Sequence, residues 1–265
     1  MCMLTNGRNE QGSLVLVRYL KAYPGMIPGG RSVPRPVQIL EIGAGLGAGG
    51  LGVAVLARHL RRFAQVNITD CDPNAVDVIE SSIACNALAP ALGAQKVLST
   101  AHQGCDDPVP TQSESESAGK NKDGETSFDR VECRASVFDW DQIASYKERY
   151  GDMKYDMILG AEVVHELSHA AGVHRAISDL LAPDGVAIMV CGAAKHRFGV
   201  VEFQDMLRND KLLVHTVEEV PRCLTHDMES LQDDMLGLQV YTIKWAEASS
   251  HKAGILPPPI KELSI

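Results

Sequence analysis

The chain has 265 residues, of which 45% are hydrophobic and 22% are charged, and its formal charge at pH 7 is −9. This composition supports a proper core and excludes a disordered chain, a collagen-like repeat and a small disulfide scaffold. No apolar run approaches the roughly 20 residues of a membrane-spanning helix. The acidic balance argues against a broad nucleic-acid-binding face. We therefore expect a soluble protein without a membrane or nucleic-acid partner.

The two ends and the cysteines indicate a reducing compartment. The first twelve residues lack the basic start and the apolar stretch of a secretory signal, and the last four contain no cysteine for prenylation. We expect a cytoplasmic or a nuclear protein. The seven cysteines form no C-x-x-C pair, which favours buried free thiols over a disulfide framework or a zinc knuckle.

Strand-like and helix-like segments alternate along the chain. In order, the sequence predicts a strand at 37–42, a helix at 51–63, a strand at 66–69, a helix at 74–88, strands at 131–137 and 155–160, a helix at 168–181, a strand at 186–191, a helix at 200–208, and strands at 212–217 and 238–245. This alternation is typical of a doubly wound, mostly parallel, seven-stranded Rossmann-like α/β sheet, and the last strands suggest one antiparallel strand at the edge. We expect one domain over residues 1–265.

One segment differs in composition from the rest. Residues 101–129 contain seven acidic residues and two lysines and almost no large apolar side chains. We expect this segment to be a disordered insert on the surface. An interaction segment is the alternative.

A glycine-rich loop follows the first expected strand. Glu41-Ile-Gly-Ala-Gly-Leu-Gly-Ala-Gly-Gly opens the next helix, and such a loop lets a ligand approach the amides at a helix start. Two ligand classes fit it. The spacing of Gly43, Gly45 and Ala48 satisfies the permissive dinucleotide pattern, whereas Glu41, Gly43, Gly45 and Gly47 match the E-x-G-x-G-x-G signature of S-adenosylmethionine sites.

Glu41 distinguishes the two classes. A buried carboxylate at this strand end would repel a pyrophosphate, but it would attract the α-amino group of a methionine. The alternative is that Glu41 pairs with a nearby arginine or lysine.

Acidic residues also end the second and the third strands. Asp70 can accept both hydroxyls of a ribose, while Asp72 can cap the helix after Pro73. Asp139 can accept an adenine amine, and the adjacent Trp140 can cover the ring.

With these residues the chain resembles class I, seven-strand S-adenosylmethionine-dependent methyltransferases, and within them the methyltransferase-like group of protein lysine methyltransferases. The resemblance runs from Gly12 to Trp245 outside the polar insert, and in it residues 12–20 resemble the first helix. It implies S-adenosylmethionine as the cofactor, a protein substrate and a monomeric enzyme. The cofactor-binding residues that it implies are Glu41, Gly43, Ala44, Gly45, Gly47, Asp70, Asp139, Trp140 and Ala161.

The resemblance also implies the residues next to the acceptor. Strand four of that family ends in an acid-x-x-aromatic motif, which here reads Glu162-Val-Val-His165. Glu162 would orient a lysine amine, and His165 would orient the substrate or accept a proton. A plain polar loop histidine is the alternative for His165. A small-molecule methyltransferase, a catalytically silent cofactor-binding protein and an NAD-dependent oxidoreductase are alternatives for the whole chain.

A second motif overlaps this one. His165-Glu166-Leu-Ser-His169 has the H-E-x-x-H spacing of zinc metalloproteases. Zinc binding requires both histidines on one helical face. Ser168 resembles the cap of the following helix, which separates the two histidines, so we expect no metal site.

Overall fold

The computed structural model describes residues 8–29, 35–86, 88, 130–193, 198–225 and 237–246. The polar insert expected at 101–129 lies outside these residues. The described elements are α1 (Arg8–Ala22), η1 (Pro24–Met26), β1 (Val37–Glu41), α2 (Ala48–His59), β2 (Ala64–Asp70), α3 (Pro73–Cys85), β3 (Val131–Val137), η4 (Trp140–Gln142), α4 (Ile143–Tyr150), β4 (Tyr155–Ala161), α5 (Leu167–Leu180), β5 (Leu181–Gly192), α6 (Phe198–Asn209), β6 (Leu213–Glu219), η6 (Arg222–Leu224) and β7 (Leu238–Trp245).

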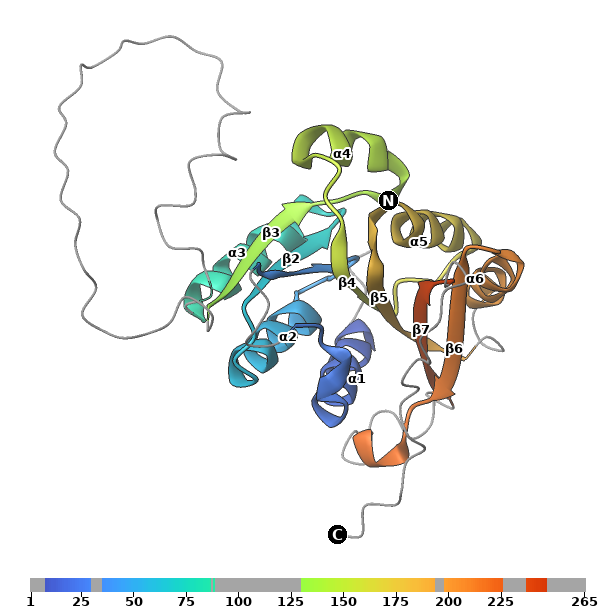
Figure 1. Ribbon diagram of the computed structural model, residues 1–265, viewed down its shortest axis with the longest axis horizontal. Helices are drawn as coiled ribbons and strands as arrows, with labels where there is room; N and C mark the ends of the chain where they lie inside the picture. Colours follow the sequence, from blue (N-terminus) through green and yellow to red (C-terminus); the bar gives the residue numbers. More distant parts are fainter. Residues whose placement is uncertain are drawn as a thin grey trace, which may run out of the picture.

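The seven strands form one sheet in the order β3-β2-β1-β4-β5-β7-β6 (Figure 1). β1 to β5 pair in parallel, and β7 pairs antiparallel with both β5 and β6. The predicted mostly parallel, seven-stranded Rossmann-like sheet is therefore confirmed. The antiparallel strand β7 lies one position inside the edge, between β5 and β6.

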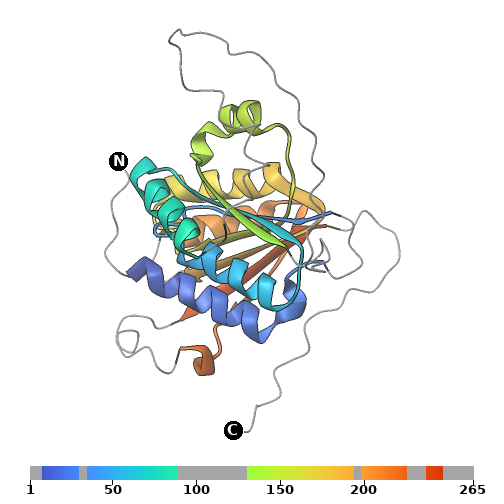
Figure 2. The same ribbon diagram turned by 90° about the vertical axis from the view of Figure 1, so that its left-hand side faces the viewer.

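Helices cover both faces of the sheet (Figure 2). One apolar cluster joins α1, α2 and α3 to one face, and a second joins α4, α5 and α6 to the other. Successive strand residues alternate between the clusters, as Ile39 belongs to the first and Leu40 to the second. Both are fully buried, which explains why the strands read as continuous apolar runs.

The structure adds one helix that the sequence analysis missed. Residues 143–150 form α4, whose buried side chains are Ile143 and Tyr146. Two buried positions three residues apart are too weak a periodic signal in an eight-residue segment. Tyr146 also belongs to a polar cluster in the core, because its hydroxyl lies 2.6 Å from the hydroxyl of Tyr155 and accepts a hydrogen bond from Asn67 Nδ2 at 2.9 Å.

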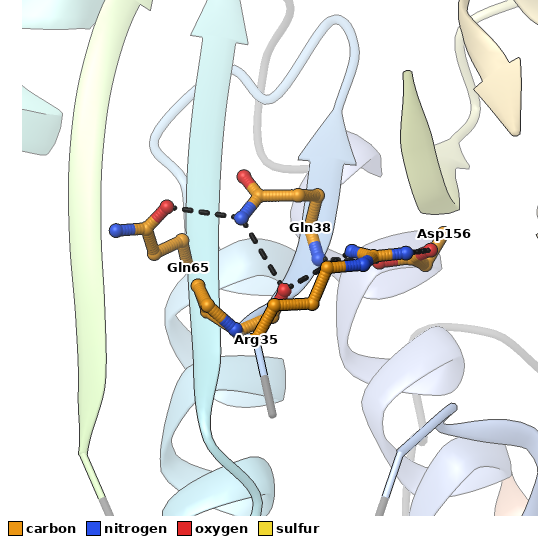
Figure 3. Close-up of polar contacts among 5 residues, drawn as sticks. Arg35, Gln38, Gln65 and Asp156 are labelled. Carbon is orange, nitrogen blue, oxygen red and sulfur yellow. Dashed lines mark hydrogen bonds and ion pairs between the residues drawn. The ribbon is translucent and has the colours of Figure 1, made fainter. Parts of the chain in front are cut away.

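A polar cluster ties together the amino ends of β1, β2 and β4 (Figure 3). Arg35 donates two hydrogen bonds to the carboxylate of Asp156, at 2.7 and 2.6 Å. Asp156 Oδ2 also accepts the backbone N–H of Gln38 at 2.9 Å, and the Gln38 side chain donates to Gln65 Oε1 at 3.0 Å. These contacts hold three neighbouring strands in register.

The cysteines differ in part from the expectation of buried free thiols. Cys71 is disulfide-bonded, which corrects that expectation at this position. Cys133 and Cys191 are buried, but Cys85 and Cys223 are exposed. Among the helices that the structure describes, none has both the length and the apolar character needed to cross a membrane.

Candidate active site

The glycine loop and the end of β4 lie next to each other at the carboxyl ends of the strands. β1 pairs with β2 on one side and with β4 on the other. The chain runs outward from β1 to β3 and then returns to β4, so the strand order reverses between β1 and β4. Ligands of open α/β sheets bind beyond the carboxyl ends at such a point. The fold therefore places both predicted motifs at the expected ligand position.

Three glycines of the loop have backbone conformations that favour glycine. The φ angle is +60° at Gly43, +57° at Gly45 and +79° at Gly47. A β-carbon on Gly43 would lie 2.8 Å from Val163 Cγ1, whereas one on Gly45 would meet no atom within 4 Å. Ala44, between them, is buried. Gly43 thus allows the two loops to touch, and Gly45 borders open space just before α2.

The carboxylate of Glu41 lies beneath the first turn of α2. Glu41 is 1% exposed, and its Oε2 accepts the backbone N–H of Gly50 at 2.8 Å. Burial raises the pKa of Glu41 to about 8, the Gly50 N–H opposes this shift, and the charge of Asp70 adds to it. No lysine or arginine in the described ranges forms an ion pair with Glu41. The observed contact is therefore a helix cap, and cofactor binding by Glu41 stays a prediction.

Asp70 holds the glycine loop in place. Its Oδ2 accepts the N–H of Gly45 at 2.8 Å, and its Oδ1 accepts the N–H of Asp72 at 3.0 Å. A carboxylate has about four acceptor positions, so Asp70 retains acceptor capacity for two hydroxyls. Asp72 is the N-cap of α3 and accepts the N–H of Asn74 at 2.9 Å. The capping alternative for Asp72 is thus confirmed.

Asp139 follows β3, the strand next to β2, whose last residue is Asp70. It caps η4, where its Oδ1 accepts the N–H of Asp141 at 2.9 Å and its Oδ2 accepts the side chain of Gln142 at 3.1 Å. Phe138 precedes it, is 2% exposed, and donates its N–H to the carbonyl of Asp70 at 2.9 Å. The ends of β2 and β3 are therefore fixed to each other, with acceptor capacity left on both carboxylates.

Trp140 is wedged between the glycine loop and α5. A β-carbon on Gly172 would overlap Trp140 Cδ1, and one on Gly43 would lie 3.4 Å from Trp140 Cζ3. The ring of His169 packs against Trp140 edge to face, with centroids 5.6 Å apart. The absence of a side chain at Gly172 therefore makes room for the indole beside the loop.

Glu162 has an unusual backbone conformation directly after β4. Its φ is +56°, which only one other non-glycine residue of the described chain matches in sign. It is 4% exposed, and its N–H donates to the carbonyl of Val190 at 2.7 Å. A β-carbon on Gly12 of α1 would lie 2.6 Å from Glu162 Cγ and 3.5 Å from Ala161 Cβ. Strained residues of this kind cluster at functional sites. Here α1 packs against the strained residue.

His165 lies in the loop before α5 and outside the helix. The helix begins at Leu167 with Glu166 as its N-cap, so Ser168 is in the first turn and is not the cap that the sequence suggested. His165 and His169 have ring centroids 6.3 Å apart. The two histidines do not share a helical face, and no group of three metal-binding side chains gathers among the described residues. The H-E-x-x-H spacing therefore lacks the zinc-protease geometry.

Three contacts at this site involve residues that the sequence analysis did not select. Gly12 admits Glu162 and Gly172 admits Trp140, while Thr69 Oγ1 donates to the carbonyl of Glu41 at 2.6 Å. The sequence offered one signal for the first two contacts, a glycine inside a helix, and many helices contain a glycine without such a contact.

A comparison with family models supports the identification of the loop. A model described as lysine methyltransferase matches residues 11–106, which is 96 of the 265 residues. The match covers the glycine loop and the Asp70 region and stops before β4. No curated protein matches the chain.

Solved structures are similar to the chain in fold. The SAH-bound methyltransferase PaMTH1 of Podospora anserina superposes with a TM-score of 0.50 at 10% identity, over 88% of this chain and 76% of that one. A TehB-like SAM-dependent methyltransferase from Corynebacterium glutamicum gives a TM-score of 0.42 at 16% identity, over 88% of each chain. The first likeness, together with the strand order, shows that the chain has the seven-stranded Rossmann-like methyltransferase fold.

Proposed function

We propose that the chain is an S-adenosylmethionine-dependent methyltransferase whose acceptor is a lysine side chain of a protein. The observation that carries this proposal is the glycine loop, in which Gly45 is held by Asp70 and borders open space beyond β1. The family-model match over the same residues supports the activity and the lysine acceptor.

The residues around this space fit the cofactor. Gly43, Gly45 and Gly47 keep side chains out of the loop. Asp70 has acceptor positions for the ribose hydroxyls, and Asp139 has one for the adenine amine. Trp140 lies between the loop and α5, where its ring can cover the adenine. Buried Ala44 and Ala161 keep the floor of the site apolar.

Glu41 contacts the start of α2. Its carboxylate caps α2 through Gly50, and its raised pKa leaves much of it neutral at pH 7. An ammonium group bound beside this carboxyl would favour its charged form and lower the pKa again. We infer that Glu41 shapes the turn that receives the methionine part of the cofactor.

The acceptor side of the site consists of Glu162 and His165. Bound S-adenosylmethionine supplies an electrophilic methyl group. A lysine amine must lose its proton before it attacks, and Glu162 at the end of β4 orients the amine for that step. The ring of His165 lies beside that of His169, which packs against Trp140. His165 borders the approach and can accept the proton. The positioning of the two reactants provides most of the rate.

Two measurements on the purified full chain test this proposal. Native mass spectrometry with added S-adenosylmethionine reads the bound cofactor and any bound metal in one spectrum. Transfer of a radioactive methyl group to a protein extract, followed by acid hydrolysis, then identifies the modified amino acid. We expect a stoichiometric cofactor adduct and methyl-lysine. The Gly45→Arg chain is the negative control for both.

Other outcomes separate the alternatives. Label in small metabolites but none in protein would replace the protein acceptor by a small molecule. An adduct without any transfer would indicate a binding protein, and no adduct would reject the cofactor assignment itself.

A further inference from the structure

Four arginines lie at the amino ends of β2 and β3, which is the opposite end of the strands from the candidate active site. Arg58 lies in the last turn of α2, Arg61 and Arg62 follow the helix, and Arg130 directly precedes β3. The N–H of Ala64 donates to the carbonyl of Arg130 at 3.1 Å, which places the two segments side by side. We call these residues the arginine cluster.

Most of the charge of this cluster is unmatched. Arg130 forms an ion pair with Glu132 at 2.8 Å. In the part of the chain that the structure describes, no acidic side chain forms an ion pair with Arg58, Arg61 or Arg62. The Nε atom of Arg62 is buried and has no hydrogen-bond partner there. Three arginines within five residues of the chain thus have no described counter-charge.

The end of helix α2 does not by itself explain why an arginine occupies position 61. Arg61 has φ +53°, and the N–H of Arg62 bonds the carbonyl of Ala57 at 2.9 Å while the N–H of Arg61 bonds that of Arg58 at 3.0 Å. This pattern ends helices at a left-handed residue that is usually glycine. An L-residue there costs about 1–2 kcal/mol. The helix dipole favours cations near this end, but it does not require an arginine at the strained position.

A strongly acidic segment of the same chain ends directly before Arg130 of the cluster. Residues 101–129 contain seven acidic residues and two lysines, a net charge of −5. Of the residues that bound the connection from α3 to β3, Leu88 accepts the N–H of Cys133 at 2.8 Å, and Arg130 belongs to the cluster. The connection from α3 to β3, which contains this segment, therefore begins and ends near the amino end of β3. A tether of this kind gives millimolar effective concentrations.

We propose that the arginine cluster is the docking surface for the acidic residues of the segment 101–129 of the same chain. The carboxylates of the segment supply the counter-charge that Arg58, Arg61 and Arg62 lack, and charge-assisted, bidentate contacts of arginine to carboxylate are the strongest available. Nucleic acid is the competing occupant. It is disfavoured because the chain as a whole carries a charge of −9, which repels a polyanion.

Zero-length cross-linking of the full-length chain tests this proposal. The R61K substitution keeps the charge and adds a primary amine that a carbodiimide can join to a touching carboxylate. Peptide mass spectrometry should find position 61 linked to acids between 106 and 129. The yield should exceed at least severalfold that of R175K, which places the amine at an exposed position in the middle of α5. It should drop severalfold in 0.5 M salt, where the screening length is a few ångströms.

The remaining outcomes decide the matter in the other direction. Equal yields in R61K and R175K would overturn the proposal, as would cross-links that form only between two copies of the chain and rise with concentration. A single-stranded RNA of 20 nucleotides provides the competing probe. RNA binding that is lost in the R58Q/R61Q/R62Q chain, in the absence of the intramolecular cross-link, would assign the cluster to nucleic acid. In a chain with E114Q, E116Q and E125Q, the cross-linking yield at the four remaining acids, 106, 107, 123 and 129, should fall, because the segment loses charge while these carboxylates stay reactive.

Discussion

The two ends of the central strands use polar residues in different ways. At the amino ends, the carboxylate of Asp156 accepts hydrogen bonds from Arg35 and from the backbone of Gln38 (Figure 3). At the carboxyl ends, Asp70 and Asp139 bond neighbouring N–H groups but retain acceptor capacity. The Asp156 contacts at the amino ends of β1, β2 and β4 thus show how this fold satisfies a polar group with a structural role.

Backbone conformation follows the same division in part, since Arg61 at the amino ends also has a positive φ. The loop after β1 contains three residues with positive φ, and Glu162 after β4 adds a non-glycine one. Strain of this kind persists where the surrounding structure enforces it and a function retains it. The candidate active site is therefore the end of the strands at which positive φ angles gather in two adjacent loops and acceptors stay open. The following predictions test this contrast, from the largest expected effect to the smallest.

Gly45→Arg should remove cofactor binding, because its side chain would fill the open space beside the loop. We expect the affinity for S-adenosylmethionine to fall at least about 100-fold, or about 2.7 kcal/mol, in isothermal titration calorimetry. Gly151→Arg is the matched control, since Gly151 also has a positive φ and open space but follows α4, away from the loop. Similar losses in both variants would indicate a folding defect in place of a pocket.

Glu162→Gln should depress methyl transfer and leave cofactor binding nearly unchanged. The amide preserves the shape of the side chain but not its charge, and groups of this kind contribute about 100-fold or more to rates. Single-turnover transfer and the cofactor Kd are the two measurements. Asp156→Asn, the corresponding change at the amino end, should leave the transfer rate intact. Full turnover in Glu162→Gln would remove this residue from the mechanism.

Glu41→Gln should change how stability depends on pH. Burial raises the folded-state pKa of Glu41 to about 8, from an ordinary value of 4.5. The folded chain therefore holds a proton that the unfolded chain has lost, so the stability that the neutral carboxyl contributes is present below pH 4.5 and declines as the pH rises to about 8. At about 1.4 kcal/mol per pKa unit, the decline amounts to a few kcal/mol.

Denaturant titrations at several pH values read this slope. The glutamine keeps an acceptor for the Gly50 N–H and should flatten the decline. Parallel profiles for the two chains would show that Glu41 is ionised in the folded state and has a partner that the described contacts do not include.

Asp156→Ala should lower stability without affecting transfer. The change leaves the N–H of Gln38 without its acceptor and breaks the bidentate contact with Arg35, whose side chain is 60% exposed. The exposed ion pair contributes little. The lost acceptor therefore accounts for most of the expected loss in the free energy of unfolding, which is about 2 kcal/mol. Asp156→Asn keeps one acceptor and should lose less. A loss of activity at unchanged stability would contradict the contrast between the two ends.

Arg61→Gly should raise stability slightly, since glycine adopts a positive φ without strain. We expect a gain of about 0.5–1 kcal/mol, measured by urea unfolding in high salt so that charge effects are screened. Arg58→Gly, inside the helix, should lose about 1 kcal/mol. A loss in Arg61→Gly at high salt would show that the arginine side chain packs favourably.

Local sequence was informative where one residue type has one physical use. Gly43, Gly45 and Gly47 were predicted to form a tight loop, and all three have positive φ. Pro73 after Asp72 predicted a capped helix, and the cap is present. The same approach failed at Ser168, where Glu166 precedes the helix instead, because several residues near a helix start satisfy the same local preference.

The side-chain environment of Glu41 shows a second limit. The sequence placed a carboxylate at a buried strand end, and burial is observed. Whether it faces a ligand, a cation or a helix start depends on how α2 packs over β1. The packing directs Glu41 toward Gly50, because both Gly49 and Gly50 leave room that any side chain would occupy.

The sequence by itself determined the alternation of strands and helices, the doubly wound sheet and the glycine loop after the first strand, because periodic burial and backbone conformation are encoded by neighbouring residues. Only the tertiary structure decided that Gly12 leaves room for Glu162, that Gly172 leaves room for Trp140 and that Arg130 lies beside the strand that follows Arg62. These contacts join residues far apart in the chain. Their geometry follows from how helices pack on the sheet, and no local pattern carries that information.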